Sequence, residues 1–314
     1  MRVLITGGAG FVGRHFNNRL VALGEDVTVV DIANPFEKEG LCPHDYWHGD
    51  FRAYVQIVAA DAFDLIIHCA AVVGGRLNIE GDPLGVATDL AIDADLFNWV
   101  VRAEKKPQVI YFSSSAAYPI HFQRSAEFHP QLTEGAITFD KNWVGVPDYT
   151  YGWSKLSGEF LAQHAVEKYG LDVKIYRPFG GYGEDQDLTY PFPAILKRVI
   201  EKQDPIVVWG SGEQCRDFIH IDDIVDIVLA TKDRLQPGEA LNLGRGIPTS
   251  FRELAETMCN VLGHKADIVS DLTKPQGVFY RVADTAKLKK LWDRPFISLE
   301  TGIQRAVDSR QPVV

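Results

Sequence analysis

Several features that mark other protein classes are missing from this sequence. No apolar run approaches the ~18 residues that predict a membrane-spanning helix, and no low-complexity tract or long charge block indicates disorder. The four cysteines, Cys42, Cys69, Cys215 and Cys259, show no C-x-x-C spacing, which is typical of free thiols and predicts no metal site. Lysine and arginine number 32 against 42 acidic residues, and the net charge of −10 argues against nucleic acid as a partner.

The start and the length of the chain narrow its class further. A strand pattern begins at residue 2, which leaves no room for a leader peptide, and together with the free thiols this predicts a cytoplasmic protein with no membrane partner. A length of 314 residues, 46% of them hydrophobic, fits one large domain or two closely packed ones. A chain of this size can bury a core without disulfides.

Strand and helix patterns alternate along the first part of the chain. The apolar runs that predict buried strands lie at 3–6, 26–31, 65–70, 109–113 and 172–178. The helical patterns lie at 11–23, 91–104 and 154–169. This alternation predicts an α/β fold with a doubly wound parallel sheet that helices cover on both faces.

After residue 178 the pattern changes to mixed helices and short strands. The predicted elements lie at 194–201, 206–209, 221–231, 250–262 and 298–309. Ser250 and Glu253 have the spacing of a capping box, and Ser298 is expected to cap the last helix. We expect one part formed by 1–178 with about 206–235, and a smaller C-terminal α/β part formed by 179–205 and 236–314.

A glycine-rich turn connects the first strand to the first helix. Gly7 permits the tight turn, Gly10 lets the backbone approach a pyrophosphate, and Gly13 allows the helix to pack on the strand. The helix N-terminus adds free N–H groups and a positive dipole. In its strand–turn–helix–strand context this spacing predicts a dinucleotide site in a Rossmann-type sheet.

Residues after three neighbouring strands fit the same site. Asp31 ends the second strand, where a carboxylate accepts ribose hydroxyls and repels a 2′-phosphate, so NAD is favoured over NADP. Asp50 and Phe51 are expected to hold the edge and the face of an adenine. Ala70 and Ala71 are small enough to let the backbone run beside a cofactor.

Tyr151 and Lys155 stand four residues apart, on one face of a helix. A free phenol, with a pKa near ~10, is a weak base at neutral pH. A nearby ammonium and a nicotinamide cation stabilise the phenolate and are expected to lower that pKa. Tyr151 is then expected to remove a hydroxyl proton, with Ser114 holding the reacting oxygen.

These motifs resemble the extended short-chain dehydrogenase/reductase family, the nucleotide-sugar epimerases and dehydratases. The resemblance covers essentially the whole chain and is carried by Thr6-Gly-Gly-Ala-Gly-Phe-Val-Gly13, Ser113-Ser-Ser, Tyr151-x-x-x-Lys155, Arg177-Pro178 and Arg216-Asp-Phe-Ile-His-Ile-Asp222. It implies tightly bound NAD and a nucleoside-diphosphate sugar as substrate. The cofactor-binding residues expected are Gly7, Gly10, Phe11, Val12, Gly13, Asp31, Asp50, Phe51, Ala70, Ala71, Tyr151, Lys155 and Pro178. The substrate-binding residues expected are Ser115, Tyr190, Trp209, Arg216 and Arg281.

The residues that follow Ser114 bear on the reaction. Dehydratases of this family carry Asp and Glu at the positions of Ser115 and Ala116, and decarboxylating relatives carry Glu at the second. GDP-fucose synthases and GDP-mannose 3,5-epimerases, which the chain also resembles, have their catalytic Cys at Ala116, and the His of the synthases falls at about Tyr190. The remaining reaction is 4-epimerisation by transient oxidation at C4, which needs only Tyr151, Lys155, Ser114 and NAD.

The stretch 121–148 is longer than is usual in the family and leaves alternatives open. Its Glu127, His129 or Glu134 could supply an acid or base for a dehydratase, a 3,5-epimerase or a 4-ketoreductase. A non-catalytic NAD-binding regulator is a third possibility, against which the presence of Tyr151 and Lys155 counts. The resemblance also implies a homodimer formed through the helices at 91–104 and 154–169, and it favours GDP over UDP.

The net charge of −10 sets a constraint on a site for two polyanions. Binding must depend on local positive potential from the helix N-terminus after Gly10 and from Arg216, Arg281 and Lys155. We therefore expect the acidic residues to concentrate away from this cleft.

Overall fold

A parallel sheet is the centre of the computed structural model, which describes residues 1–35, 40–124, 127, 130–139 and 144–310. In that part of the chain the sheet has seven strands in the order β11-β6-β5-β4-β1-β2-β3, all parallel. The strands are β1 (Arg2–Thr6), β2 (Asp26–Asp31), β3 (Asp45–His48), β4 (Leu65–His68), β5 (Gln108–Phe112), β6 (Val173–Pro178) and β11 (Ala240–Leu243). The predicted doubly wound α/β fold is confirmed.

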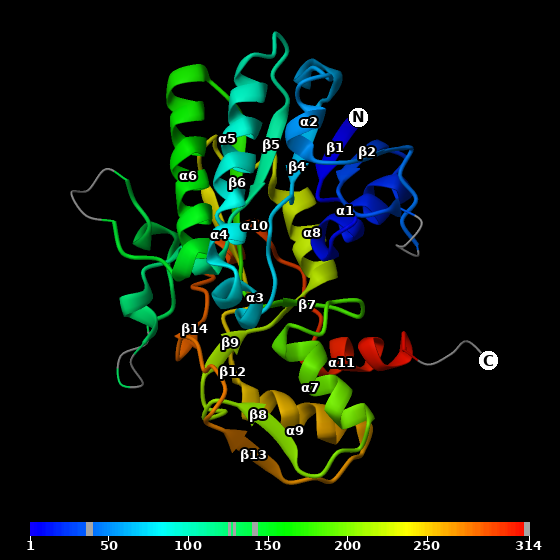
Figure 1. Ribbon diagram of the computed structural model, residues 1–314, viewed down its shortest axis with the longest axis vertical. Coiled ribbons are helices and arrows are strands. Elements are labelled where there is room, and N and C mark those ends of the chain that lie inside the picture. The colour runs from blue at the N-terminus through cyan, green and yellow to red at the C-terminus, as the bar shows by residue number, and fades with distance from the viewer. Residues whose placement is uncertain (36–39, 125–126, 128–129, 140–143, 311–314) are drawn as a thin grey trace.

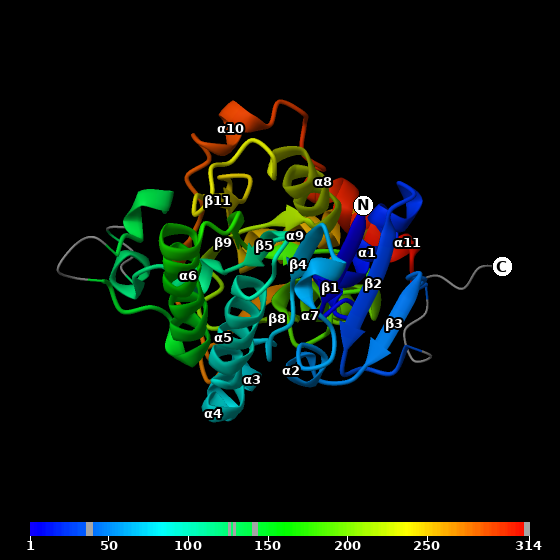
Figure 2. The same ribbon diagram turned by 90° about the horizontal axis from the view of Figure 1, so that it is seen from above.

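Helices cover both faces of this sheet because its strands are apolar on both sides (Figure 2). One face packs against α1 (Phe11–Ala22), α8 (Ile221–Thr231) and α10 (Leu288–Leu291). The other packs against α2 (Phe51–Tyr54), α5 (Thr88–Val101) and α6 (Tyr149–Tyr169). Short helices and turns complete this part: η2 (Ala60–Ala62), α3 (Arg76–Gly81), α4 (Pro83–Val86), η3 (Ser115–Ala117), η4 (Ile120–Gln123) and η5 (Glu134–Ala136).

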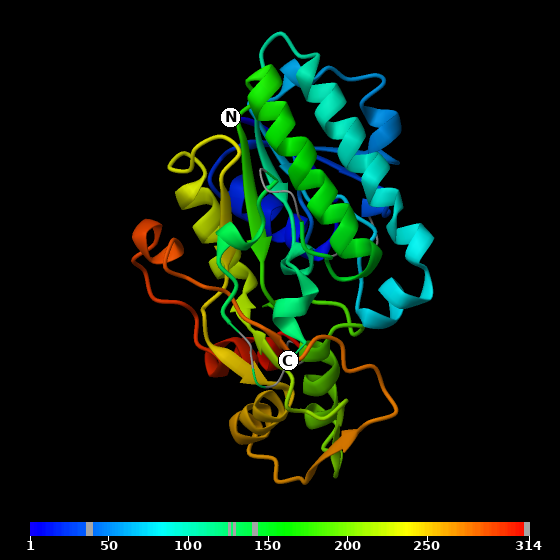
Figure 3. The same ribbon diagram turned by 90° about the vertical axis from the view of Figure 1, so that its left-hand side faces the viewer.

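A smaller α/β part lies at one end of the sheet (Figures 1 and 3). Its helices α7 (Pro191–Ile200), α9 (Phe251–Leu262) and α11 (Leu299–Asp308) share a separate apolar core. Its short strands are β7 (Gly181–Tyr182), β8 (Ile206–Trp209), β9 (Cys215–Asp217), β10 (Ile219–His220), β12 (Pro248–Ser250), β13 (Ile268–Asp271) and β14 (Tyr280–Arg281). The capping box of Ser250 with Glu253 and the cap by Ser298 are both confirmed.

Two strands pair differently from what the expected division of the chain implies. β8 pairs with β13 in the smaller part and does not join the seven-stranded sheet. β11, expected in the smaller part, is instead the edge strand of the large sheet beside β6. Short apolar runs fit either sheet, and only the packing partner decides: Val208 lies in the core of the smaller part, whereas Leu241 and Leu243 lie in the core under β6.

Among the described residues, no helix is both long and apolar enough to cross a bilayer. All four cysteines are unpaired.

Candidate active site

The glycine-rich turn between β1 and α1, called the glycine-rich cradle below, packs so closely on neighbouring backbone that side chains on Gly7 and Gly13 would collide with it. Gly7 has a φ of +67°, and a Cβ on it would lie 2.7 Å from the Ala70 backbone. A Cβ on Gly13 would lie 2.4 Å from the Gly7 carbonyl oxygen. Helix α1 begins after Gly10 with no side-chain cap and no acidic residue in its first turn. The turn therefore presents backbone N–H groups and uncompensated positive potential, which suits a pyrophosphate.

Further predicted cofactor residues lie near this cradle, at the edge where the parallel strands end. Phe11 and Val12 form the first turn of α1, Ala71 follows β4, and Pro178 ends β6. All four are half-buried. The structure thus brings together residues from distant parts of the chain at one edge of the sheet, as parallel strands require.

Asp31 lies at the end of β2, beside the glycine-rich turn. One of its carboxylate oxygens accepts a hydrogen bond from Ala9 N at 2.9 Å, and the other accepts one from Ala33 N at 2.8 Å. A carboxylate has about four lone-pair sites, so both oxygens can still accept ribose hydroxyls. Asp31 thus supports the turn and remains available to a ligand.

The expected adenine pair, Asp50 and Phe51, is only partly suited to that role. Asp50 caps α2 by accepting from Arg52 N at 2.8 Å, and it pairs with the Arg52 guanidinium at 2.6 Å. The Phe51 ring is 4% exposed and packs in the core against His68 and Trp99. The expectation that this ring offers its face to an adenine is wrong, because it begins a helix whose apolar side faces the sheet.

The catalytic residues expected from the sequence lie together. Ser114 caps the turn η3 after β5, and its Oγ accepts from Ala116 N at 3.0 Å. The Ser114 hydroxyl is within hydrogen-bonding reach of the Tyr151 phenol. Lys155 Nζ lies 6.0 Å from the centre of the Tyr151 ring and 5.4 Å from that of Tyr111. The i, i+4 spacing on α6 thus places both side chains beside Ser114, at the end of β5.

The pKa of Tyr151 departs from the expectation. Burial raises the pKa of Tyr151 above its ordinary value, although the Lys155 ammonium and the hydrogen bond with Ser114 oppose this rise. With only the chain's own groups present, the expected lowering of the Tyr151 pKa is therefore wrong. Burial removes water from the phenol, and this effect outweighs the charge of Lys155. A further positive charge beside the phenol is needed to make it a good base.

Two buried carboxylates of α5 lie near Lys155, and sequence reasoning missed both. Asp93 accepts from Tyr111 Oη at 2.5 Å and contacts His68 Nε2 at 3.2 Å. Asp89 accepts from Val72 N at 2.6 Å, and burial raises its pKa to about 6. Burial also disfavours the Lys155 ammonium, but these carboxylates outweigh it and raise the pKa of Lys155. Their i, i+4 spacing, which places both carboxylates on one face of α5, is the signal that could have found them.

Arginines from three separate segments meet around one carboxylate. Asp148 accepts from Arg76 Nη1 at 3.0 Å and from Arg281 Nη2 at 2.7 Å, and its side chain is 5% exposed. Burial, together with the charges of Arg281 and Arg76, lowers the pKa of Arg216 to about 9. A guanidinium whose charged form is disfavoured by its surroundings would be stabilised by an anionic ligand. Arg216 and Arg281 are therefore brought together as expected, and Arg76 and Asp148 join them unforeseen.

The other expected substrate residues lie around the same region. Tyr190 stands at the N-cap position of α7, and burial, with a smaller contribution from the nearby Tyr151, raises the pKa of Tyr190. Ser115 is buried in η3 next to Ser114. Trp209 ends β8, and Lys274 Nζ lies 5.8 Å from the centre of its ring.

One of the acid and base candidates in 121–148 is engaged elsewhere in the structure. Glu134 accepts from Asn242 N at 2.9 Å, at the edge strand β11, and the expectation that it supplies an acid or base is wrong for that reason. Glu127 is exposed. His129 lies outside the described residues, as do residues 140–143. Asp148, at the end of this stretch, contacts Arg76 and Arg281 of the candidate site.

Three acidic residues nevertheless lie within the cleft itself. Asp89, Asp93 and Asp148 are buried beside Lys155 and the arginines. The reason is physical: a buried cation needs a counter-charge.

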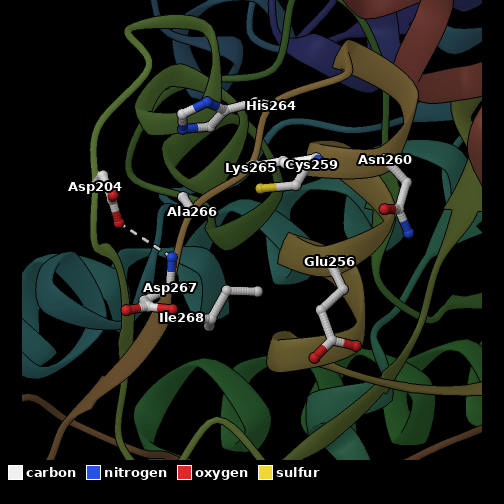
Figure 4. A pocket seen from close by; sticks show the side chains of 9 residues that line it. All are labelled: Asp204, Glu256, Cys259, Asn260, His264, Lys265, Ala266, Asp267 and Ile268. Carbon is white, nitrogen blue, oxygen red and sulfur yellow. Dashed lines mark hydrogen bonds between the residues drawn. The ribbon is translucent and has the colours of Figure 1, made fainter.

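An open groove lies elsewhere, between α9 and the strand β13 (Figure 4). It encloses about 540 Å³ and is lined by polar side chains, among them Glu256, Asn260 and Lys265. Asp204 accepts from Asp267 N at 3.0 Å across it, and His264 contacts the Gln203 carbonyl oxygen at 2.8 Å. None of the residues predicted to bind a ligand lines this groove. Within the described residues, no three His, Cys, Asp or Glu side chains are grouped so as to hold a metal ion.

Comparison with known proteins agrees with this geometry. Residues 3–244 match the family described as "NAD dependent epimerase/dehydratase family". The chain is 27% identical to GDP-L-fucose synthase of Escherichia coli, with 96% of this chain and 94% of that protein covered. It is 29% identical to UDP-glucuronate 4-epimerase of Thermodesulfobacterium geofontis, with 97% and 94% covered. The UDP-glucose 4-epimerase structure from Thermotoga maritima superposes with a TM-score of 0.83 at 23% identity, over 98% of each chain.

Proposed function

Because the chain belongs to the NAD dependent epimerase/dehydratase family, we propose that it is an NAD-dependent nucleoside-diphosphate-sugar 4-epimerase. The observation that carries this proposal is the grouping of Tyr151, Lys155 and Ser114 beside the glycine-rich cradle, with Ala116 where dehydratases carry an acid. Such a site can oxidise and reduce a sugar carbon, and its η3 turn holds no acid or base for a further step.

The cofactor fits the residues that are present. The uncapped start of α1 after Gly10 offers backbone N–H groups to a pyrophosphate, and Asp31 remains able to accept the ribose hydroxyls. When bound, NAD would supply a hydride acceptor, and a positive charge next to Tyr151. That charge opposes the effect of burial on the pKa of Tyr151, as a working base requires.

The chain's own residues then move and hold one proton. The Tyr151 Oη takes the proton of the sugar hydroxyl as that carbon is oxidised, and returns it to the oxygen when the carbon is reduced. Because Ser114 Oγ already accepts from Ala116 N, its hydroxyl proton is available to donate to the reacting oxygen or to the phenolate. The positive charge of Lys155 stabilises the Tyr151 phenolate.

The reaction is tested by the mass of the product formed in D₂O. A 4-epimerase is expected to give an isomer of unchanged mass, because the hydrogen at C4 never exchanges with solvent, and absorbance at 340 nm should show no net change. A product heavier by about one or two mass units would show exchange next to a ketone and overturn the proposal in favour of a 3,5-epimerase. Loss of water would indicate a dehydratase, and stoichiometric NADPH consumption a 4-ketoreductase.

Nucleotide recognition is proposed at Arg216, Arg281 and Trp209, with GDP favoured over UDP. The destabilised guanidinium of Arg216 supports a diphosphate partner, since an anion there restores the charge balance. At 100 times its Kd, a nucleoside diphosphate should add about 2.7 kcal/mol to the stability of the protein. Thermal melting with GDP, UDP, CDP and dTDP should show this rise.

Arg216→Met should remove the response to nucleoside diphosphates, because the guanidinium that would hold the diphosphate is lost. Arg19→Met, which breaks a pair with Asp226 on the α1–α8 side, is the control that should keep the response. An Arg216→Met protein that responds like the wild type would remove this residue from the site.

We also propose a homodimer through α5 and α6. Three large apolar side chains on these neighbouring helices are unusually exposed: Leu90 at 41%, Trp153 at 46% and Phe160 at 43%. Light scattering should give twice the chain mass of 35.0 kDa, and a monomer would contradict the proposal.

A further inference from the structure

The first turn of α6, which leads to Tyr151, is held in an unusual way. Asp148 stands at the N-cap, where an aspartate normally accepts from the helix N–H groups, but its side chain makes no capping bond. Tyr149, the next residue, has a φ of +53°, a left-handed conformation that is strained for a bulky side chain. Strain of this kind persists only where surrounding contacts impose it.

Arg76 and Arg281 contact this turn directly. Arg76 Nη1 lies 3.0 and 3.1 Å from the two carboxylate oxygens of Asp148, and its guanidinium stacks 4.3 Å from the centre of the Tyr149 ring. Arg281 Nη2 donates to Asp148 at 2.7 Å, and its Nε donates to Gln123 at 2.5 Å. Asp148 is thus fixed from α3 on one side and from β14 on the other.

The backbone of Asp148 ties the same point to the catalytic residues. Its N–H donates to the Ala116 carbonyl oxygen at 2.9 Å, in the turn that Ser114 caps. Its carbonyl oxygen accepts from Gly152 N at 2.9 Å, in the residue after Tyr151. One residue therefore contacts two arginines through its side chain and both catalytic segments through its backbone.

We propose that Asp148 is a positioning residue, and that with Arg76 it links occupation of the diphosphate site to the placement of Tyr151. This inference rests on the proposed function. Without a diphosphate, Asp148 is the counter-charge for Arg76 and Arg281. With a diphosphate bound at Arg216 and Arg281, Asp148 stays paired with Arg76 and fixes the strained start of α6, so that Tyr151 Oη meets the sugar hydroxyl. Arg76 belongs to this site by holding Asp148.

The test is Asp148→Asn, with nucleoside diphosphate binding and turnover measured separately. Loss of the carboxylate removes an anion that competes with the diphosphate, so the affinity for GDP or UDP should stay the same or rise about threefold. Turnover should fall at least about tenfold, because Tyr151 is no longer held. Asp226→Asn, which removes a carboxylate paired with Arg19 away from the site, should change neither.

The outcomes separate this inference from the proposed function. Wild-type protein that neither binds a nucleoside diphosphate nor converts a sugar would defeat the proposed function itself. If the wild type does both, equal loss of binding and turnover in Asp148→Asn would show a merely structural residue, and unchanged turnover would also overturn the inference. Should Asp148→Asn not fold, the charge-balanced Asp148→Asn/Arg76→Gln protein should show the same split, with binding kept and turnover lost.

Discussion

Tyr151→Phe should lower turnover by about 10³-fold while leaving the fold intact and the affinity for nucleoside diphosphates within about threefold. The substitution removes one oxygen atom from a side chain at the start of α6 and keeps the ring. What is lost is the atom that takes the hydroxyl proton, next to Ser114 and Lys155. Melting temperature, nucleotide binding and single-turnover rates check the three parts of this expectation.

The wild-type rate should also rise with pH, whereas the residual rate of Tyr151→Phe should not follow that rise. The base is active only when deprotonated, and burial raises the pKa of Tyr151, so activity is lost as the pH falls. Tyr176→Phe is the matched control, since Tyr176 is a fully buried phenol whose Oη lies 2.9 Å from Thr231 Oγ1, in the core away from the site. It should lose about 1 kcal/mol of stability and no turnover. A Tyr151→Phe protein with more than about a tenth of wild-type turnover would contradict the assigned base.

The parts of the site that the sequence predicts all follow from rules of secondary structure. Gly7, Gly10 and Gly13 are constrained by local backbone geometry, and Tyr151 and Lys155 by the period of a helix. Ser114 follows a strand, and parallel strands place their ends at one edge of the sheet. Each of these inferences needs only a few neighbouring residues and one rule of secondary structure.

The parts that the sequence does not predict depend on packing between distant segments. Arg76, Asp148 and Arg281 come from three elements and meet only in the folded chain. The Phe51 ring could face a ligand or the core, and its contact with Trp99 decides this. Whether burial or charge controls a pKa likewise depends on the depth of the group, which a sequence motif does not reveal.

Glu159→Gln should lower the free energy of unfolding by about 3–5 kcal/mol, the largest loss of stability that we expect from a single change. Glu159 and Arg177 are 1% and 3% exposed and form a two-point ion pair, with Nη2 to Oε2 at 2.6 Å and Nε to Oε1 at 2.8 Å. Glutamine leaves the Arg177 charge buried without its counter-charge. The loss should appear as a lower midpoint of denaturant unfolding with an unchanged slope.

The same pair also connects α6 to the strands behind the active site. Ser113, one residue before Ser114, donates to Glu159, and Arg177 Nη1 donates to Tyr118 Oη at 3.0 Å and to the Glu134 carbonyl oxygen at 2.9 Å. Replacing both charges, in Glu159→Leu/Arg177→Met, should be less damaging than the sum of the single changes, because no buried charge then remains unpaired. If the double variant is instead as unstable as that sum, the pair contributes through packing alone. In that case the burial of an unpaired charge is not what makes Glu159→Gln destabilising.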